Sequence, residues 1–262
     1  MGSATTQALA AAAIALDAQT VDLETARELF TAAQVIGSSK QLGGALADPT
    51  ASVASRSQVV ATVFGAQFQP ATIAALTAAV SLRWSNPADL VAGIEDLGVR
   101  AASRAAEGVD LEGELFSVSR VIAENPALEL ALGSRLGQDE AKGALIEKLL
   151  AGKASEVTTL VVSSLVQDPR GRRVRSMLSH AMRLVAQQRG GVVATVTSAS
   201  ALSAEQQERL TVALSKNYGG RISLNVVIDP AVVGGLRVQI ADDVIDGTIS
   251  SRIEDLRQKL AG

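Results

Sequence analysis

The sequence predicts a mainly α-helical protein, built from tandem, duplicated helical bundles that are followed by a small α/β C-terminal domain. Three observations lead to this prediction. Hydrophobic residues make up 47% of the chain but aromatic residues only 2%, so the core must be aliphatic and suited to close helix packing. An internal repeat spans the first 190 residues. At Gly190-Gly191 the apolar pattern then changes from helical spacing to the alternation of β-strands.

Helical spacing dominates residues 1 to about 190. Asn86-Pro87, Asn125-Pro126 and Asp168-Pro169 each place a side chain that can cap a helix before a proline suited to the first helical turn. Apolar residues then recur three or four positions apart, as expected for one buried face per helix. The clearest stripes are Leu111, Leu115, Val118 and Ile122; Leu145, Leu149 and Leu150; Val157, Leu160, Val161 and Leu165; and Met177, Leu178, Met182, Leu184 and Val185.

The repeat has an offset of 86 residues. Glu28-Leu29-Phe30 recurs as Glu114-Leu115-Phe116, and Val35-Ile36 recurs as Val121-Ile122. Between residues 28–46 and 114–132, eight of nineteen aligned positions are identical, whereas chance gives about two. We therefore expect bundle copy one at residues 1–107 and bundle copy two at residues 108–190.

Residues 191–262 follow the order β-α-β-β-α. Val192 to Ser198 is rich in β-branched residues, and Ser203-Ala204-Glu205-Gln206 is a capping box that begins a helix. Two alternating segments, 222–228 and 236–240, are predicted strands. We expect Asp242-Asp243 to form a turn and Asp246 to lie at the N-terminus of a last helix, whose apolar stripe is Ile249, Ile253, Leu256 and Leu260.

Composition excludes several kinds of chemistry. The chain of 262 residues contains no cysteine and one histidine, which excludes disulfides, thiolate catalysis and His-rich metal sites. The net charge of −3 argues against a surface dominated by nucleic-acid contacts. The longest apolar stretch, Ala8 to Leu16, is far shorter than the roughly 20 residues of a membrane-spanning helix. We expect no catalytic residue, no cofactor and no metal.

Four local features remain to be interpreted. Asp242, Asp243 and Asp246 are assigned to turn and cap positions rather than to a cation site. The basic run Arg170 to Arg175 is read as a partner surface or a solvated helix after Asp168-Pro169, with nucleic-acid binding as the alternative function. His180 is assigned to the edge of the core or to the surface. Gly234-Gly235 is expected to allow close backbone approach or a bulge before the strand 236–240.

The segment Asp229 to Ile240, DPAVVGGLRVQI, resembles the signature of the δ subunit of F-type ATP synthases, a family related to the mitochondrial oligomycin-sensitivity-conferring subunit. The segments 124–128 (ENPAL), 149–153 (LLAGK), 192–199 and 242–256 also resemble this family. The resemblance covers residues 110–262. An extra unit precedes it, which the repeat identifies as a duplicate bundle, and such long forms are similar to those of actinobacteria.

The resemblance implies a non-catalytic stator subunit on the cytoplasmic face of the bacterial membrane, attached to the membrane only through its complex. Its implied partners are the N-terminal helix of an α subunit and the C-terminal end of the b-subunit stalk. Within this picture, we expect the helix with Val157, Leu160, Val161 and Leu165 to line the α-subunit groove, together with the helix near Leu97 to Ala106. The last helix, with Ile249, Ile253 and Leu256, is expected to hold the b subunit.

Overall fold

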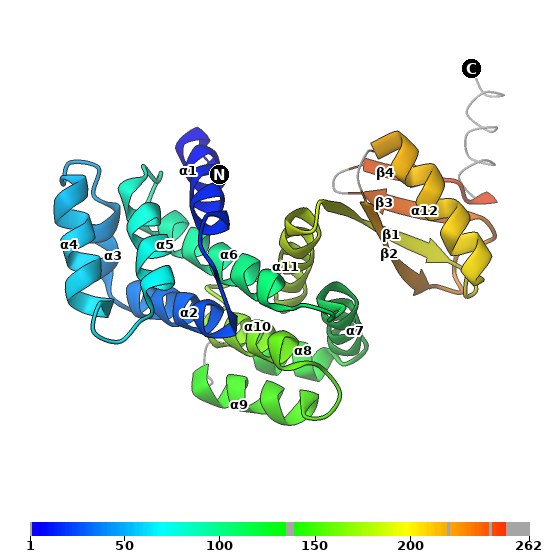
Figure 1. Ribbon diagram of the computed structural model, residues 1–262. Helices are drawn as coiled ribbons and strands as arrows, with labels where there is room; N and C mark the ends of the chain where they lie inside the picture. The colour runs from blue at the N-terminus through cyan, green and yellow to red at the C-terminus, as the bar shows by residue number, and fades with distance from the viewer. Residues whose placement is uncertain (1, 135–138, 219–220, 241–242, 250–262) are drawn as a thin grey trace, which may run out of the picture. The chain divides into compact units, whose positions relative to one another are not determined.

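The computed structural model describes residues 2–134, 139–218, 221–240 and 243–249. They form two compact units, Met1–Val185 and Ala186–Gly262, and Figure 1 shows the order of their elements. The prediction of a helical protein with a small α/β C-terminal part is confirmed. The helices of the first unit are α1 (Ser3–Asp17), α2 (Leu23–Ser38), α3 (Lys40–Ala47), α4 (Val53–Phe64), α5 (Pro70–Ser81), α6 (Pro87–Ala105), α7 (Leu111–Glu124), α8 (Pro126–Gly133), α9 (Asp139–Leu150), α10 (Glu156–Gln167) and α11 (Val174–Gln188), whose end extends past the boundary.

The 86-residue repeat is a structural repeat as well. Helices α3, α4 and α5, shifted by 86 residues, coincide at both ends with α8, α9 and α10. Residues 3–17 of α1, shifted in the same way, become residues 89–103, which lie inside α6. Helix α6 thus ends copy one and also takes the place of a first helix in copy two.

A carboxylate at the same repeat position fixes both copies. Glu28 on α2 accepts hydrogen bonds from the backbone N–H of Gln69 at 2.9 Å and from the hydroxyl of Thr72 at 2.5 Å. Glu114 on α7 accepts the matching bonds from Ser155 N–H at 2.9 Å and from Thr158 Oγ1 at 2.5 Å. Each glutamate therefore satisfies donors at the N-terminus of the fifth helix of its copy, where a negative charge is favoured.

Helix α6 is the centre of the first unit. It packs against α1, α2, α3, α5 and α10, and α10 also reaches α2, so the two copies share one hydrophobic core (Figure 1). Two glycines let neighbours approach this helix closely: a Cβ at Gly98 would lie 3.1 Å from the ring of Phe30, and Gly93 lies against the indole of Trp84. A division between copies at residue 107 stays a prediction, since residues 1–185 pack as one unit.

Three charged groups join the end of copy two to α6. Glu95 on α6 is buried and accepts hydrogen bonds from Arg172 at 2.6 and 2.9 Å, and it also pairs with Arg170. Burial alone would lower the pKa of Arg172, but the hydrogen bond and charge of Glu95 raise it above its ordinary value. Burial raises the pKa of Asp168, and the neighbouring charge of Arg170 opposes this effect.

This cluster overturns one expected helix start. Asp168-Pro169 does not begin a helix, because α10 ends at Gln167 with Asp168 as its C-cap, and α11 begins only at Val174. In the intervening turn, Arg170 and Gly171 have φ angles of 47° and 76°, which no helix accommodates. The turn directs Arg170 and Arg172 toward Glu95, so these two arginines do not belong to a solvated helix.

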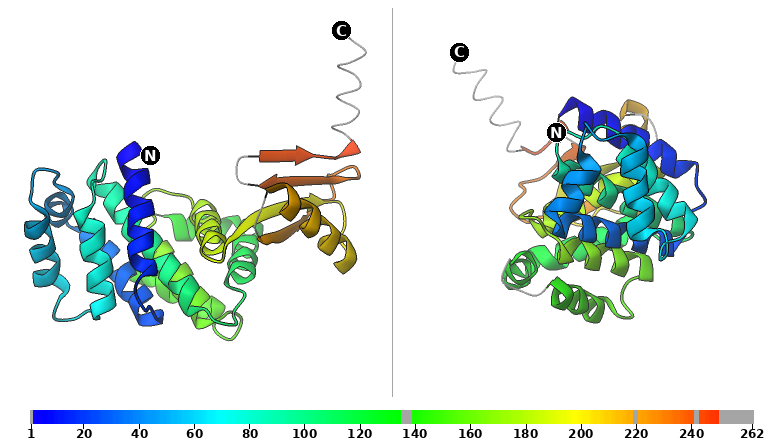
Figure 2. Two further views of the ribbon diagram at one scale, coloured as in Figure 1. Left: turned by 45° about the horizontal axis from the view of Figure 1, so that its top comes forward. Right: turned by 90° about the vertical axis from the view of Figure 1, so that its left-hand side faces the viewer.

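The second unit contains one four-stranded sheet, β1 (Gly191–Ser198), β2 (Arg221–Ile228), β3 (Leu236–Ile240) and β4 (Asp243–Asp246), in the order β2-β1-β3-β4. Strands β1 and β2 are parallel and are connected through α12 (Ala204–Tyr218), which packs on the sheet (Figure 2). Strand β3 is antiparallel to β1 and β4. The core of this unit is Ala194, Val196, Leu214, Ile222, Val238 and Ile240.

Strand β4 was not expected from the sequence. Asp243 begins this strand rather than closing a turn. Asp246 ends the strand, and its expected place at the N-terminus of the last helix stays a prediction, since residues 250–262 lie outside the described residues. The carboxylate of Asp246 accepts hydrogen bonds from the backbone and hydroxyl of Thr248, at 3.0 and 2.7 Å. All four residues of β4 are exposed, so no alternation of apolar and polar side chains marks it in the sequence.

The close approach expected at Gly234-Gly235 is confirmed. Both residues have positive φ angles, 66° and 82°. A Cβ on Gly235 would lie 2.9 Å from the Cα of Thr248, and one on Gly234 would lie 2.7 Å from the side chain of Ile249. Ile249 N–H donates to the carbonyl of Gly234 at 3.2 Å. Glycine is required at both positions because the φ angles are positive and because no space remains for a Cβ atom.

We predict that Glu114→Gln lowers the stability of the first unit by about 1–2 kcal/mol at neutral pH, because charge-assisted hydrogen bonds are lost. Burial raises the pKa of Glu114, but its bonds to Thr158 and Ser155 outweigh this effect and hold the pKa below its ordinary value. A depressed carboxyl pKa stabilises the fold above the unfolded pKa of about 4.3, and this stability is lost as pH falls. The difference between wild type and variant should therefore shrink below that pH.

Urea denaturation followed by far-UV circular dichroism, repeated across this pH range, measures the effect of Glu114→Gln. Glu124→Gln is the matched control, since Glu124 lies on the same helix in an exposed pair with Arg120. A constant difference between Glu114→Gln and wild type at all pH values would contradict the assigned role.

We further predict that Glu95→Gln destabilises the first unit by about 3 kcal/mol, because two partly buried arginines lose their counter-charge. Glu24→Gln, which breaks the exposed pair with Arg27, should cost less than about 1 kcal/mol. Denaturation midpoints of the two variants give the comparison. Equal midpoints would show that the Glu95 cluster contributes no more than a surface ion pair.

Candidate partner-binding surfaces

The apolar face predicted to line a groove on α10 is part of the core. Val157, Leu160, Val161 and Leu165 are between 0% and 8% exposed. Helix α10 packs against α2, α6, α7 and α9, and the predicted partner segment, Leu97 to Ala106, belongs to α6 and is itself largely buried. The structure thus brings the predicted groove residues together in the interior of the first unit, and their contact with a partner stays a prediction.

The matching helix of copy one is more open. Ala71, Ala74 and Ala78 on α5 are half-buried and recur at i, i+3 and i+7, so they share one helix face. Their repeat counterparts are Val157, Leu160 and Ser164. The three alanine positions of α5 carry only methyl groups, beside half-buried Ile73, Thr77 and Ser81 on the same open side of the helix, and they allow the backbone of another helix to approach closely. Sequence reasoning missed this face because alanine gives little contrast in a chain so rich in it.

The predicted site for the second partner lies almost wholly beyond the described part of the chain. Ile253 and Leu256 fall in residues 250–262, outside the described residues. Ile249 is exposed, and its backbone is fixed against Gly234 at the edge of the sheet. Val244 and Ile245 on β4 are exposed as well. Apolar side chains therefore lie on the surface at the point where the last predicted helix would begin.

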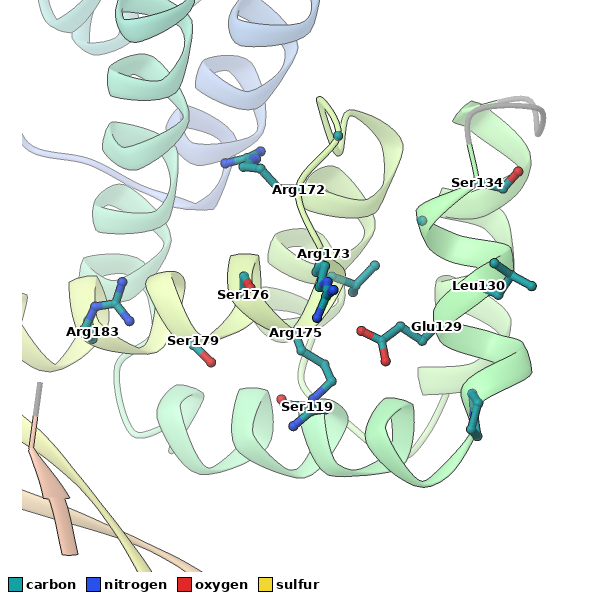
Figure 3. A pocket seen from close by; sticks show the side chains of 14 residues that line it. Ser119, Glu129, Leu130, Ser134, Arg172, Arg173, Arg175, Ser176, Ser179 and Arg183 are labelled. Carbon is teal, nitrogen blue, oxygen red and sulfur yellow. The ribbon is translucent and has the colours of Figure 1, made fainter. Parts of the chain in front are cut away.

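The basic run Arg170 to Arg175 divides into two parts. Arg170 and Arg172 are held by Glu95, as described above. Arg173 and Arg175 are exposed, and among the described residues neither forms an ion pair. Figure 3 shows Arg172 pointing away from Arg173 and Arg175. Only the second part of the run is therefore presented to solvent.

Arg173 and Arg175 face a groove of about 1030 Å³ between α8 and α11 (Figure 3). Arg183 lines it two turns further along α11, while Glu129 and Leu130 line it from α8. Figure 3 shows Glu129 directed from α8 toward α11. The groove is therefore basic on the α11 side, whereas the α8 side carries one acidic and one apolar side chain. We call it the Arg groove and define it by these five residues.

His180 lies at the edge of the core, as expected. Its Nε2 is 2.8 Å from a carboxylate oxygen of Asp96 on α6, and its Nδ1 is 3.4 Å from the guanidinium of Arg183. The histidine therefore helps to fix α11 to α6.

The described residues contain neither a metal-binding cluster nor a membrane-spanning helix. That part of the chain holds no group of three or more histidine, cysteine, aspartate or glutamate residues that could bind a metal ion. Asp243 and Asp246 lie at opposite ends of β4, and Asp242 lies outside the described residues. None of the described helices is both long and apolar enough to cross a membrane.

Comparison with known proteins identifies the family. A sequence model described as "ATP synthase delta (OSCP) subunit" matches residues 99–260, starting within α6. The chain is 44% identical over its full length, and over the full length of the relative, to "ATP synthase subunit delta" of Leifsonia xyli. It is 38% identical, again over both full lengths, to the protein of that name from Streptomyces griseus. Identity to the Thermobifida fusca protein of that name is 39%, covering 90% of this chain and 89% of the relative.

Among solved structures, a chain of the Toxoplasma gondii mitochondrial ATP synthase hexamer is similar at 21% identity with a TM-score of 0.37, covering 64% of this chain and 97% of that one. This TM-score is too low to support an argument. The comparisons do not support the alternative of a nucleic-acid-associated protein. The family match covers more than half of the sequence, and the relatives align from end to end. The chain belongs to the ATP synthase delta (OSCP) family.

Proposed function

We propose that this chain is a non-catalytic stator subunit of a proton-translocating F-type ATP synthase, which connects the catalytic head to the membrane-anchored stalk. The observation that carries the proposal is end-to-end similarity to proteins named ATP synthase subunit delta. The presence of two separately packed units supports it, because a connector needs two attachment surfaces. Its work is mechanical: both attachments must hold while the rotor turns.

We propose that the first unit binds the N-terminal helix of an α subunit on α5 of copy one. A helix docking in a groove needs an accessible apolar face. The alanine face of α5 is half-buried and accessible, whereas the α10 face with Val157, Leu160, Val161 and Leu165 is already buried within the unit. Binding at α10 would require its core contacts to open first. Binding at α10 is the alternative that the experiment below distinguishes from binding at α5.

We propose that the C-terminal unit holds the end of the b-subunit stalk through the segment that begins at Ile249. Exposed Val244, Ile245 and Ile249 supply an apolar surface at this edge, and Ile253 and Leu256 continue the stripe in the sequence. The chain would thereby reside at the cytoplasmic face of the membrane through its complex, with no membrane contact of its own.

The two copies can be compared at one repeat position. Ala78→Glu on α5 should weaken binding of a peptide of the α-subunit N-terminal helix about tenfold or more, because a charge is buried in the apolar contact. Ser164→Glu, at the matching half-buried position of α10, should leave binding unchanged. Fluorescence anisotropy with a labelled peptide measures both variants, and thermal unfolding checks that they fold. Weakening by Ser164→Glu alone would move the site to α10.

The stalk attachment is tested by deleting residues 250–262, which leaves the backbone contacts of Thr248 and Ile249 with the sheet in place. We expect the shortened chain to lose association with b subunits and to keep α-subunit binding. Pull-down of α and b subunits from solubilised membranes, by full-length and shortened chains in parallel, gives the answer. If the shortened chain retains b at normal strength, the stalk site lies elsewhere, and if even the full-length chain retains neither subunit, the stator proposal fails.

A further inference from the structure

The place in copy one that matches the Arg groove holds a smaller groove of about 510 Å³, lined by Gly44, Ala47 and Pro87 among others. Helix α3, the repeat equivalent of α8, packs directly on α6, and a Cβ at Gly43 would lie 3.8 Å from the Cβ of Pro87. At the matching positions of α8, Glu129 and Leu130 replace Gly43 and Gly44. The groove of copy two is about 1030 Å³, twice as large, and it carries larger side chains on its α8 wall. Copy two therefore presents a larger and more basic groove than copy one at this place.

The charges of the groove are arranged along one helix face. Arg175, Ser179 and Arg183 recur at i, i+4 and i+8 on α11 and all line the groove. At 1.5 Å per residue, the two arginines are about 12 Å apart along the helix axis. Within the described residues, Arg175 has no ion pair, and Arg183 makes only a 3.4 Å contact with His180. Arg175 and Arg183 are thus two positive charges, two helical turns apart, that are not neutralised by carboxylates of the described residues. They can pair with two carboxylates that are spaced by two turns on another helix.

The opposite wall adds an apolar contact. Leu130 is 76% exposed on α8 and lines the groove next to Pro126. An exposed leucine beside a row of arginines fits an amphipathic segment, whose apolar side would cover Leu130 while its carboxylates meet α11. Glu129 lies in the same groove and repels any anion, the carboxylates of a docked helix included. No aromatic residue lines the groove, so stacking of bases has no platform.

We propose that the Arg groove docks an acidic amphipathic helix of a partner protein. This surface is additional to the α-subunit and b-subunit attachments proposed above and does not depend on them. Arg175 and Arg183 bind carboxylates two turns apart, and Leu130, across the groove on α8, receives an apolar side chain. The overall charge of −3 does not weaken this attraction much, because charges beyond about 10 Å are screened at physiological salt.

The probe is a fluorescein-labelled synthetic helix with glutamates two turns apart and a leucine stripe, measured by anisotropy with the full-length chain. We expect binding that weakens as salt rises from about 50 to about 300 mM, and a glutamine version of the peptide that binds at least about tenfold more weakly. The double variant Arg175→Glu/Arg183→Glu should reduce affinity by a similar factor. Glu129→Gln should increase affinity, since it removes repulsion. Leu130→Ala should weaken binding several-fold without loss of stability.

Arg27→Glu/Arg209→Glu is the matched control: both arginines are exposed, lie outside the groove, and change the net charge by the same amount. If the control pair and the groove pair weaken the affinity for the peptide equally, the proposal is overturned. It is also overturned if Glu129→Gln leaves the affinity for the peptide unchanged. A poly-uridylate RNA and vesicles containing phosphatidylglycerol are tested in parallel. Tighter binding of either, with the same dependence on Arg175 and Arg183, would assign the groove to nucleic acid or lipid and overturn the proposal as well.

Discussion

The first unit depends on the burial of one helix by both halves of a duplicated sequence. Helix α6 packs against four helices of copy one and against α10 of copy two, and twelve of its nineteen residues are buried. Sharing α6 removes the need for a second first helix and makes residues 1–185 one cooperative core. A gene duplication has in this way produced one body rather than two linked ones.

Polar interactions then fix the positions of helix ends and turns, which non-directional apolar packing does not determine by itself. Glu28 and Glu114 hold the N-termini of α5 and α10, and Glu95 holds the turn before α11. Each glutamate pairs with donors more than 40 residues away, so each closes a long segment of chain. Such directional contacts give a connector a defined shape, which matters more for transmitting torque than a large margin of stability.

The two copies have diverged in what they leave accessible. Copy one keeps an alanine face on α5 and has a smaller groove, of about 510 Å³, between α3 and the start of α6. Copy two buries the corresponding face of α10 and opens the Arg groove between α8 and α11. Equivalent positions thus serve packing in one copy and present a surface in the other. This division lets one chain offer different partner surfaces without a new fold.

The sequence by itself determined the helical class, the 86-residue repeat, the α/β C-terminal unit and the family, because periodicity and local motifs are properties of neighbouring residues. It failed where long-range contacts decide. Strand β4 is short and fully exposed, and only pairing with β3 reveals it. Asp168-Pro169 has the local sequence of a helix start. Arg170 and Arg172 instead form hydrogen bonds with Glu95, more than 70 residues away, and lie in a turn rather than in a helix. The apolar stripe on α10 is equally compatible with the lining of a binding groove and with a face buried in the core. Tertiary structure alone decides between the two, because burial depends on which other helices pack on that face.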